Sequence, residues 1–98
     1  MYRHVILFIW KPGTTSEQVA AAHRSLATLP DRLPHIRAFS AGPDAGRLQH
    51  NADYALIADF DDPSGYLAYR DGPYHLSIID RFMAPIIESY VRVQYHAD

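Results

Sequence analysis

Short segments of alternating hydrophobic residues predict four strands in this chain. In residues 2–10 the alternation divides the side chains into two sets, and both sets are largely apolar. One set is Tyr2, His4, Ile6, Phe8 and Trp10, and the other is Arg3, Val5, Leu7 and Ile9. This strand is therefore expected to be covered on both faces. Further strands are predicted at residues 35–41, 54–60 and 90–95.

Two helical regions separate these strands. The first is predicted from Ser16, a candidate N-cap, to about Thr28, with apolar positions at helical spacing. The second is a pair of short helices. One opens at residues 61–64 and reaches about Tyr69, and the other starts at Pro73 and bends or ends near residue 85. Residues 42–52 are polar, contain two glycines and predict a loop or a wide hairpin.

The order strand, helix, strand, strand, helix pair, strand predicts an α+β fold of the ferredoxin-like βαββαβ type. Its four antiparallel strands would carry the helices on one face and leave the other apolar face without cover. A second copy of the sheet is the simplest cover, so the pattern predicts a homodimer in the form of a dimeric α/β barrel. The 98 residues contain no repeat and no linker, and we expect one domain over residues 1–98.

Composition restricts the classes of function. A net charge of -2 and a pI near 6.3 give no electrostatic case for binding nucleic acid or an anionic membrane. No stretch approaches the roughly 18 apolar residues that a membrane span needs. The absence of cysteine excludes disulfides, thiolate catalysis and cysteine-based metal sites. With no signal-peptide pattern in the first residues, we expect a cytoplasmic protein.

The segment from Tyr69 to His75 carries the clearest candidate chemistry. A phenol and an imidazole flank a helix-breaking Gly72-Pro73 step that can aim both side chains at one place. Imidazole is suited to proton transfer near neutral pH, and the start of a helix disfavours a positive charge on it. The alternative interpretation is that the two rings form only a packed, hydrogen-bonded hinge.

Several motifs, taken in order along the chain, resemble the stress-responsive A/B barrel, or Dabb, domain family. The resemblance spans about residues 3–95. It rests on His4-Val5-Ile6-Leu7-Phe8, Lys11-Pro12-Gly13, Leu29-Pro30, Gly42, Asp53-Tyr54-Ala55-Leu56-Ile57, Phe60, and Tyr69 with Pro73 and His75. It implies the same dimeric ferredoxin-like barrel that the pattern predicts. Most members of the family have no assigned reaction, some respond to stress in plants, and one is a polyketide cyclase that uses neither a metal nor an organic cofactor.

The cyclase of this family implies roles for three residues. Its general base is a His and the assisting group a Tyr at the spacing of His75 and Tyr69, and a further His in its first strand matches His4. The chain also departs from the family. Gly72 replaces the first His of a common His-Pro-x-His pattern, and Ala55 stands where the cyclase has a His. A substrate different from that of the cyclase is therefore expected.

An apolar pocket around these three residues would exclude water and fold a flexible substrate. The side chains expected to line it and bind the substrate are Ile6, Phe8, Leu26, His23, Ile57, Ile79 and Phe82. A base and a donor that converge on a carbonyl compound can support aldol cyclisation, isomerisation or lactone opening. The six histidines show none of the spacings of metal motifs, so no metal site is expected.

Three functions remain open on these grounds. The first is a cofactor-independent enzyme that acts on a small carbonyl-rich molecule, with polyketide cyclisation as its sharpest form. The second is a non-catalytic stress-responsive or binding barrel, whose cavity holds a small apolar ligand or is closed by Phe8, Trp10 or Phe82. The third is a haem-handling barrel with His75 or His4 as axial ligand, which nothing in the sequence favours.

Overall fold

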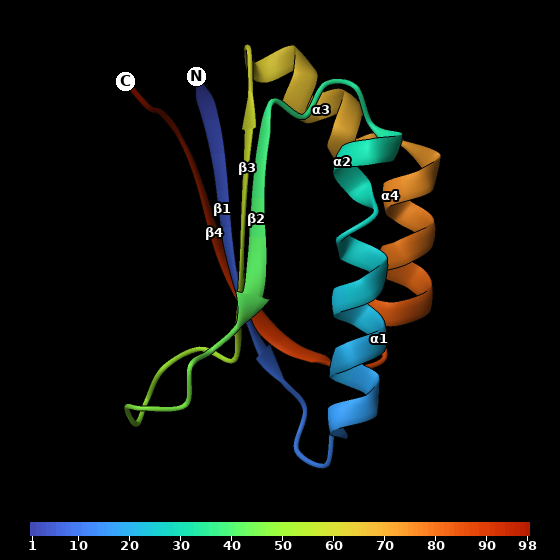
Figure 1. Cartoon of the computed structure of the whole chain (residues 1–98), viewed down its shortest axis with the longest axis vertical. Coiled ribbons are helices and arrows are strands. Elements are labelled where there is room, and N and C mark those ends of the chain that lie inside the picture. The colour runs from blue at the N-terminus through green and yellow to red at the C-terminus, as the bar shows by residue number, and fades with distance from the viewer.

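The computed structural model describes residues 1–98 and packs a four-stranded antiparallel sheet against a single layer of helices (Figure 1). The strands are β1 (Tyr2–Trp10), β2 (Ala38–Pro43), β3 (Tyr54–Phe60) and β4 (Ile87–His96). They lie in the order β2-β3-β1-β4, which leaves β2 and β4 at the sheet edges. The ferredoxin-like α+β prediction is confirmed.

The helices all lie on the same side of the sheet (Figure 1). They are α1 (Ser16–Leu26), α2 (Leu29–Arg32), α3 (Pro63–Asp71) and α4 (Pro73–Ile78). A π-helical turn, η1 (Ile79–Met83), continues α4 and ends two residues before Pro85. No helix of the chain combines the length and the apolar character needed to cross a membrane.

The ends of three elements differ from the sequence-based prediction. Thr15, not Ser16, caps α1, because its hydroxyl accepts from the Gln18 amide at 3.1 Å while the Gln18 side chain accepts from the Thr15 amide at 2.9 Å. The first helix stops at Leu26, and a proline in the first turn of α2 starts a second helix.

The second and fourth strands are displaced from their predicted bounds for a different reason, the pairing with neighbouring strands. β2 starts at Ala38 and not at residue 35, because pairing with β3 begins only where the Arg37 amide donates to the Asp59 carbonyl at 2.8 Å. β4 starts at Ile87 and not at residue 90, since Ile87 already pairs with Trp10 at the end of β1. The first residue of each of these two strands is therefore set by its partner strand, and the local sequence pattern gives no information about that partner.

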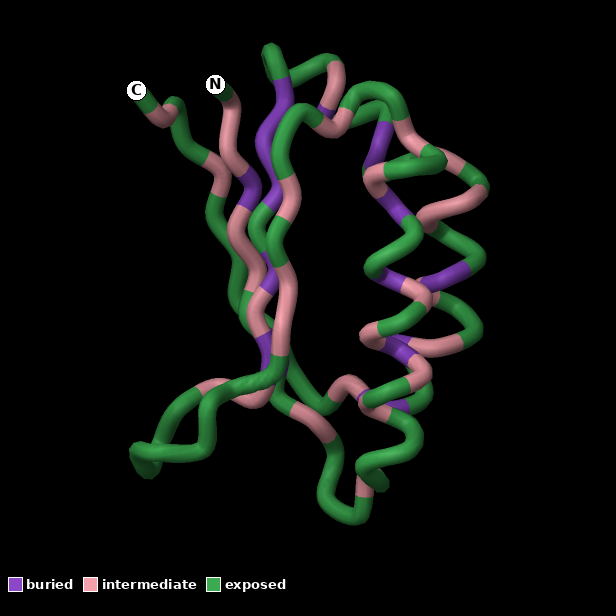
Figure 2. Tube along the Cα trace, in the orientation of Figure 1, coloured by how far each residue is buried: buried purple, intermediate pink, exposed green.

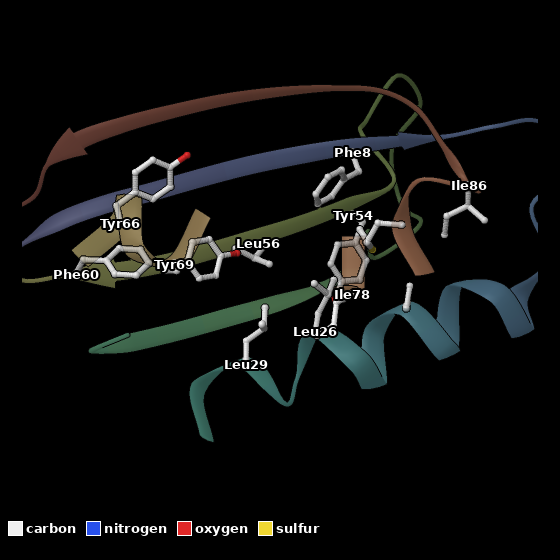
Figure 3. Packing of buried hydrophobic residues seen from close by; sticks show 13 residues of the cluster. Phe8, Leu26, Leu29, Tyr54, Leu56, Phe60, Tyr66, Tyr69, Ile78 and Ile86 are labelled. Atoms are coloured by element: carbon white, nitrogen blue, oxygen red, sulfur yellow. The ribbon is translucent and has the colours of Figure 1, made fainter. Parts of the chain in front are cut away.

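The register gives the sheet two distinct faces. His4 lies between Ala58 of β3 and Gln94 of β4; His4 and Ala58 are buried toward the helices and Gln94 is half-buried. Figure 2 shows buried positions recurring along both layers. Core side chains fill the space between them (Figure 3). The cluster consists of Phe8, Ala22, Leu26, Leu29, Tyr54, Leu56, Ala58, Phe60, Tyr66, Tyr69, Ile78, Met83 and Ile86.

The opposite side of the sheet, here called the bare face, carries no helix (Figure 1). Its exposed apolar side chains come from three strands. They are Leu7, Ile9, Ile57, Val91, Val93 and Tyr95. The alternation predicted for the first strand is therefore present, but only one of its two apolar faces is covered within the protomer.

Candidate functional site

A cavity of about 230 Å³ lies between the helix-covered face of the sheet and the helices α3 and α4. Its wall is mostly apolar, with histidine, tyrosine and arginine side chains set into it. The lining residues are His4, Ile6, Phe8, Leu26, Leu56, Tyr66, Tyr69, Arg70, His75, Leu76, Ile79, Ile87, Tyr90 and Arg92. The three polar residues singled out from the sequence, His4, Tyr69 and His75, all reach this cavity.

The break between α3 and α4 brings Tyr69 and His75 together. Tyr69 is in the last turn of α3 and His75 in the first turn of α4, and their ring centroids are 4.3 Å apart. Gly72 forms the junction, where an added Cβ would lie 2.9 Å from the Ala68 carbonyl oxygen. A side chain at this position would therefore require a local shift of the turn between α3 and α4.

A hydrogen bond fixes the state of the His75 ring. Its Nδ1 lies 3.0 Å from the Arg70 carbonyl oxygen, and because a carbonyl oxygen only accepts, Nδ1 carries the hydrogen. The lone pair is then on Nε2. Burial lowers the pKa of His75, although the Arg70 carbonyl and the Asp71 carboxylate act in the opposite direction. A neutral imidazole with a free Nε2 can accept a proton.

Tyr69 complements this base. The residue is buried, and burial raises the pKa of its phenol well above the usual value, so it stays protonated at neutral pH. Its hydroxyl forms no hydrogen bond within the chain and is not sealed from the cavity. In Figure 3 this hydroxyl points from α3 toward Leu56. The phenol is therefore available as a donor to a molecule in the cavity.

His4 forms a second polar group on the sheet side of the cavity. The Gln94 amide nitrogen donates to its Nδ1 at 2.8 Å and lies 3.4 Å from the Tyr66 hydroxyl. The hydrogen of His4 is then on Nε2. Burial, followed by the charges of Arg92 and His75, lowers the pKa of His4 to about 4. His4 is therefore neutral at physiological pH and acts as a donor.

Three residues expected in the pocket lie outside it. Ile57 faces the bare face, because the alternation of β3 turns its neighbour Leu56 to the cavity instead. The His23 Nδ1 is 2.6 Å from the Tyr54 hydroxyl and forms a polar contact between α1 and β3. Phe82 lies in a separate surface groove under the Arg81 guanidinium. Ile6, Phe8, Leu26 and Ile79 line the cavity as expected.

Sequence reasoning missed the contribution of β4. Tyr90 and Arg92 line the cavity, and alternation along this strand already sets both on the same side as Gln94. The missing information was the pairing of Gln94 with His4, which identifies that side as the helix-covered face. Tyr66 was also missed. It lies one helical turn before Tyr69, a spacing that puts both phenols on one side of α3.

Comparison with known proteins supports the fold. The chain is 33% identical to a dimeric ferredoxin-like protein of unknown function from Thermobifida fusca, with a TM-score of 0.90 over 98% of this chain and 90% of that one. A dimeric protein of unknown function and ferredoxin-like fold from Bacteroides fragilis is 22% identical, with a TM-score of 0.83 over 98% of this chain and 95% of the other. A comparison with curated protein sequences gives no match.

A hydroxynitrile lyase from Passiflora edulis has the same fold. It is 19% identical, with a TM-score of 0.84 over 99% of this chain and 93% of the lyase, an identity at which the likeness concerns the fold alone. The stress-responsive A/B barrel (Dabb) domain matches residues 2–97, almost the whole chain. The protein therefore belongs to the stress-responsive A/B barrel domain family.

Proposed function

We propose that this protein is a cofactor-independent enzyme that removes a proton next to a carbonyl group of a small substrate. His75 is the general base and Tyr69 the proton donor. The observation that carries the proposal is the pair of rings 4.3 Å apart in the cavity wall, with the Nδ1 hydrogen of His75 held by the Arg70 carbonyl. This arrangement leaves a base and an acid, both neutral, beside the same space.

The proposed reaction begins when Nε2 of His75 takes a proton from the carbon next to a carbonyl. The electron pair of the C–H bond forms the C=C bond of the enolate while the π pair of the carbonyl moves to its oxygen, and the phenol of Tyr69 stabilises the enolate by donating a hydrogen bond to that oxygen. The lowered pKa of His75 and the raised pKa of Tyr69 keep each group in the required state at neutral pH.

Intramolecular aldol closure, as in polyketide cyclisation, is the sharpest form of the proposal. The enolate carbon forms a bond to a second carbonyl carbon, whose oxygen takes the proton from His75. His4, a neutral donor through Nε2, is suited to hold that second oxygen. The aliphatic wall formed by Ile6, Leu26 and Ile79 would exclude water and favour a folded chain.

We also infer that the active form is a homodimer joined through the bare face. On β4, Val91 is 66% exposed and Val93 is 53% exposed, on the face that carries no helix. Contiguous exposed apolar side chains of this kind mark contact surfaces. The similar proteins from Thermobifida fusca and Bacteroides fragilis are dimeric, which supports the same assembly.

Hydrogen–deuterium exchange tests the proton-transfer step without knowledge of the natural substrate. The protein is incubated in D₂O with 1-phenyl-1,3-butanedione, 4-oxo-4-phenylbutanoate and the methyl ester of the latter, and loss of the proton signals next to the ketone is followed by NMR. The wild type is expected to accelerate exchange. His75→Gln should lower this rate by about 10²- to 10⁴-fold, the usual contribution of a general base.

Two further variants sharpen the experiment. Tyr69→Phe removes the donor and should lower the exchange rate by about 10²-fold, the usual loss for one oxyanion donor. His35→Gln changes an exposed histidine outside the cavity and should leave the rate unchanged. Exchange that survives His75→Gln contradicts the proposed base. Binding of these compounds with no acceleration of exchange in the wild type would favour the second function, a ligand-binding barrel.

A further inference from the structure

Arg92 differs from Arg70, the other arginine that lines the cavity, in having no acidic partner. Arg70 also lines the cavity, but its Nε lies 2.8 Å from the Asp71 carboxylate, which neutralises its charge. Arg92 forms no salt bridge and donates no side-chain hydrogen bond within the chain. The cavity therefore contains one uncompensated guanidinium in a mostly apolar wall.

The position of Arg92 places it at the open side of the cavity. Arg92 belongs to the edge strand β4 and is exposed to solvent. It pairs with Ile6 of β1, and the next pair on the same face of the sheet is that of His4 with Gln94. Its positive charge contributes to the lowered pKa of His4 and opposes the raised pKa of Tyr66. The charge therefore acts on the interior of the cavity as well as on the solvent.

The N–H donors of Arg92 form no hydrogen bond within the chain. The central carbon of its guanidinium lies 5.6 Å from the centroid of the Tyr90 ring, a cation–π contact. The N–H donors of a guanidinium point outward in the plane of the group. A guanidinium supported in this way presents a planar fork that matches the two oxygens of a carboxylate.

We propose that the substrate carries a carboxylate and that Arg92 binds this group at the mouth of the cavity. The inference rests on the proposed function, because it uses the same cavity and assigns the carbonyl end of the same molecule to His75 and Tyr69. A carboxylate is favoured over a phosphate dianion because only one cation is free and the remaining wall is mostly apolar. Arg92 is thus a specificity-determining residue for an oxo acid.

Matched pairs of acids and methyl esters test this inference by binding alone. The probes are 4-oxo-4-phenylbutanoate and octanoate, each with its methyl ester, and affinity is measured by NMR titration of the intact protein. In the wild type at least one acid should bind about tenfold or more tightly than its ester, as expected for a hydrogen-bonded charge pair. Added salt should reduce this preference, because it screens an ion pair at an open site.

Variants of Arg92 identify the group responsible. Arg92→Gln should abolish the preference for the acid, and Arg92→Lys should restore it in part because the charge returns without the planar fork. Arg81→Gln is the matched control, since Arg81 also lies over an aromatic ring but outside the cavity. Equal affinity for acid and ester in the wild type, failure of both acids to bind, or a preference that survives Arg92→Gln would overturn the inference.

The outcome can be separated from that of the proposed function. His75→Gln leaves Arg92 in place, so the preference for the acid should persist in this variant while proton exchange is lost. If exchange survives His75→Gln but the preference depends on Arg92, the catalytic proposal fails and the carboxylate site stands. If exchange depends on His75 but the preference survives Arg92→Gln, the carboxylate site fails and the base stands.

Discussion

The two faces of the sheet are built from alternate residues of the same strands, yet they differ in chemistry. The helix-covered face sets His4, Gln94 and Arg92 among apolar side chains and borders the cavity. The bare face is mainly aliphatic, and its prominent polar feature is the Arg3–Asp59 ion pair. The alternation of side chains along the strands therefore puts residues suited to binding a ligand on one face and residues suited to contact with another protein surface on the other.

This separation lets the mostly apolar cavity contain a few polar side chains without loss of the core. Two buried polar side chains beneath the helices have a partner from another element, Gln94 for His4 and His23 for Tyr54. No buried side-chain nitrogen or oxygen lacks a hydrogen-bond partner. Association through the bare face would leave these internal contacts unchanged, because the sheet itself lies between the two surfaces.

The largest expected effect comes from a charge on the bare face. Leu7 lies in the central strand β1, paired with Ala55 on one side and Val91 on the other. In Leu7→Lys, an ammonium group would be buried without a partner when two sheets pack together. The dissociation constant of the dimer should rise by about 100-fold or more, equivalent to roughly 3 kcal/mol, as measured by sedimentation velocity.

The control for this variant is Leu67→Lys. Leu67 is similarly exposed but lies on α3, in the helical layer and away from the bare face. It should leave the dimer intact. If Leu7→Lys sediments as a dimer at the same protein concentrations as the wild type, the bare face is not the contact surface.

Much of this fold was predictable because local patterns and global topology agree. The third strand, Tyr54–Phe60, was predicted with its bounds, since a turn-forming loop precedes it and the Asp62-Pro63 helix start follows it closely. The start of β2 was not, because the first contact of that strand, between Arg37 and Asp59, joins residues far apart in sequence. The ends of an element were predicted correctly where neighbouring turn residues set them, and incorrectly where pairing with another strand set them.

The candidate site was predictable to a smaller extent. Tyr69 and His75 are close in sequence, so a local argument about the Gly72-Pro73 break could bring them together. Arg92 reaches the cavity only through the register between β1 and β4, which a single sequence does not specify. Ile57 was misplaced because its apolar character suits either face, and one residue of register decides between them.

The helix-covered face should make folding sensitive to mild acid. The pKa of His4 is about 4 in the folded protein and about 6.5 in the unfolded chain, so the unfolded chain binds more protons between these values. Stability is complete above about pH 6.5 and falls as the pH drops toward 4. The loss should be on the order of 2 kcal/mol, at about 1.4 kcal/mol per pKa unit and allowing for incomplete burial. His75, whose pKa is also lowered, contributes in the same direction.

Urea unfolding at pH 7 and at pH 4.5, at one protein concentration, measures this loss. His4→Gln retains an amide next to Gln94 but does not titrate, so its difference between the two pH values should be smaller than that of the wild type. His35→Gln replaces an exposed histidine and should keep the wild-type difference. An equal loss in His4→Gln and the wild type would contradict the assignment of this sensitivity to His4.

The bare face should respond to acid at a lower pH and by a smaller amount. The Arg3 guanidinium holds Asp59 through contacts of 2.7 and 2.9 Å and lowers the pKa of this carboxyl. Its contribution to stability is present above the unfolded pKa of about 3.9 and is lost as the pH falls through the lower folded value. A double-mutant cycle of Arg3→Gln and Asp59→Asn should give a favourable coupling energy at pH 7.

The exposed Arg37–Asp61 pair provides a matched cycle, because its side chains are 54% and 60% exposed whereas those of Arg3 and Asp59 are 35% and 9% exposed. Solvent screening should make its coupling energy smaller than that of Arg3–Asp59. If the two pairs have equal coupling energies, the bare face shields Arg3 and Asp59 from water no more than the exposed Arg37–Asp61 pair is shielded. A larger value for Arg3–Asp59 that also falls in Leu7→Lys would instead show that association of the two sheets supplies part of that protection.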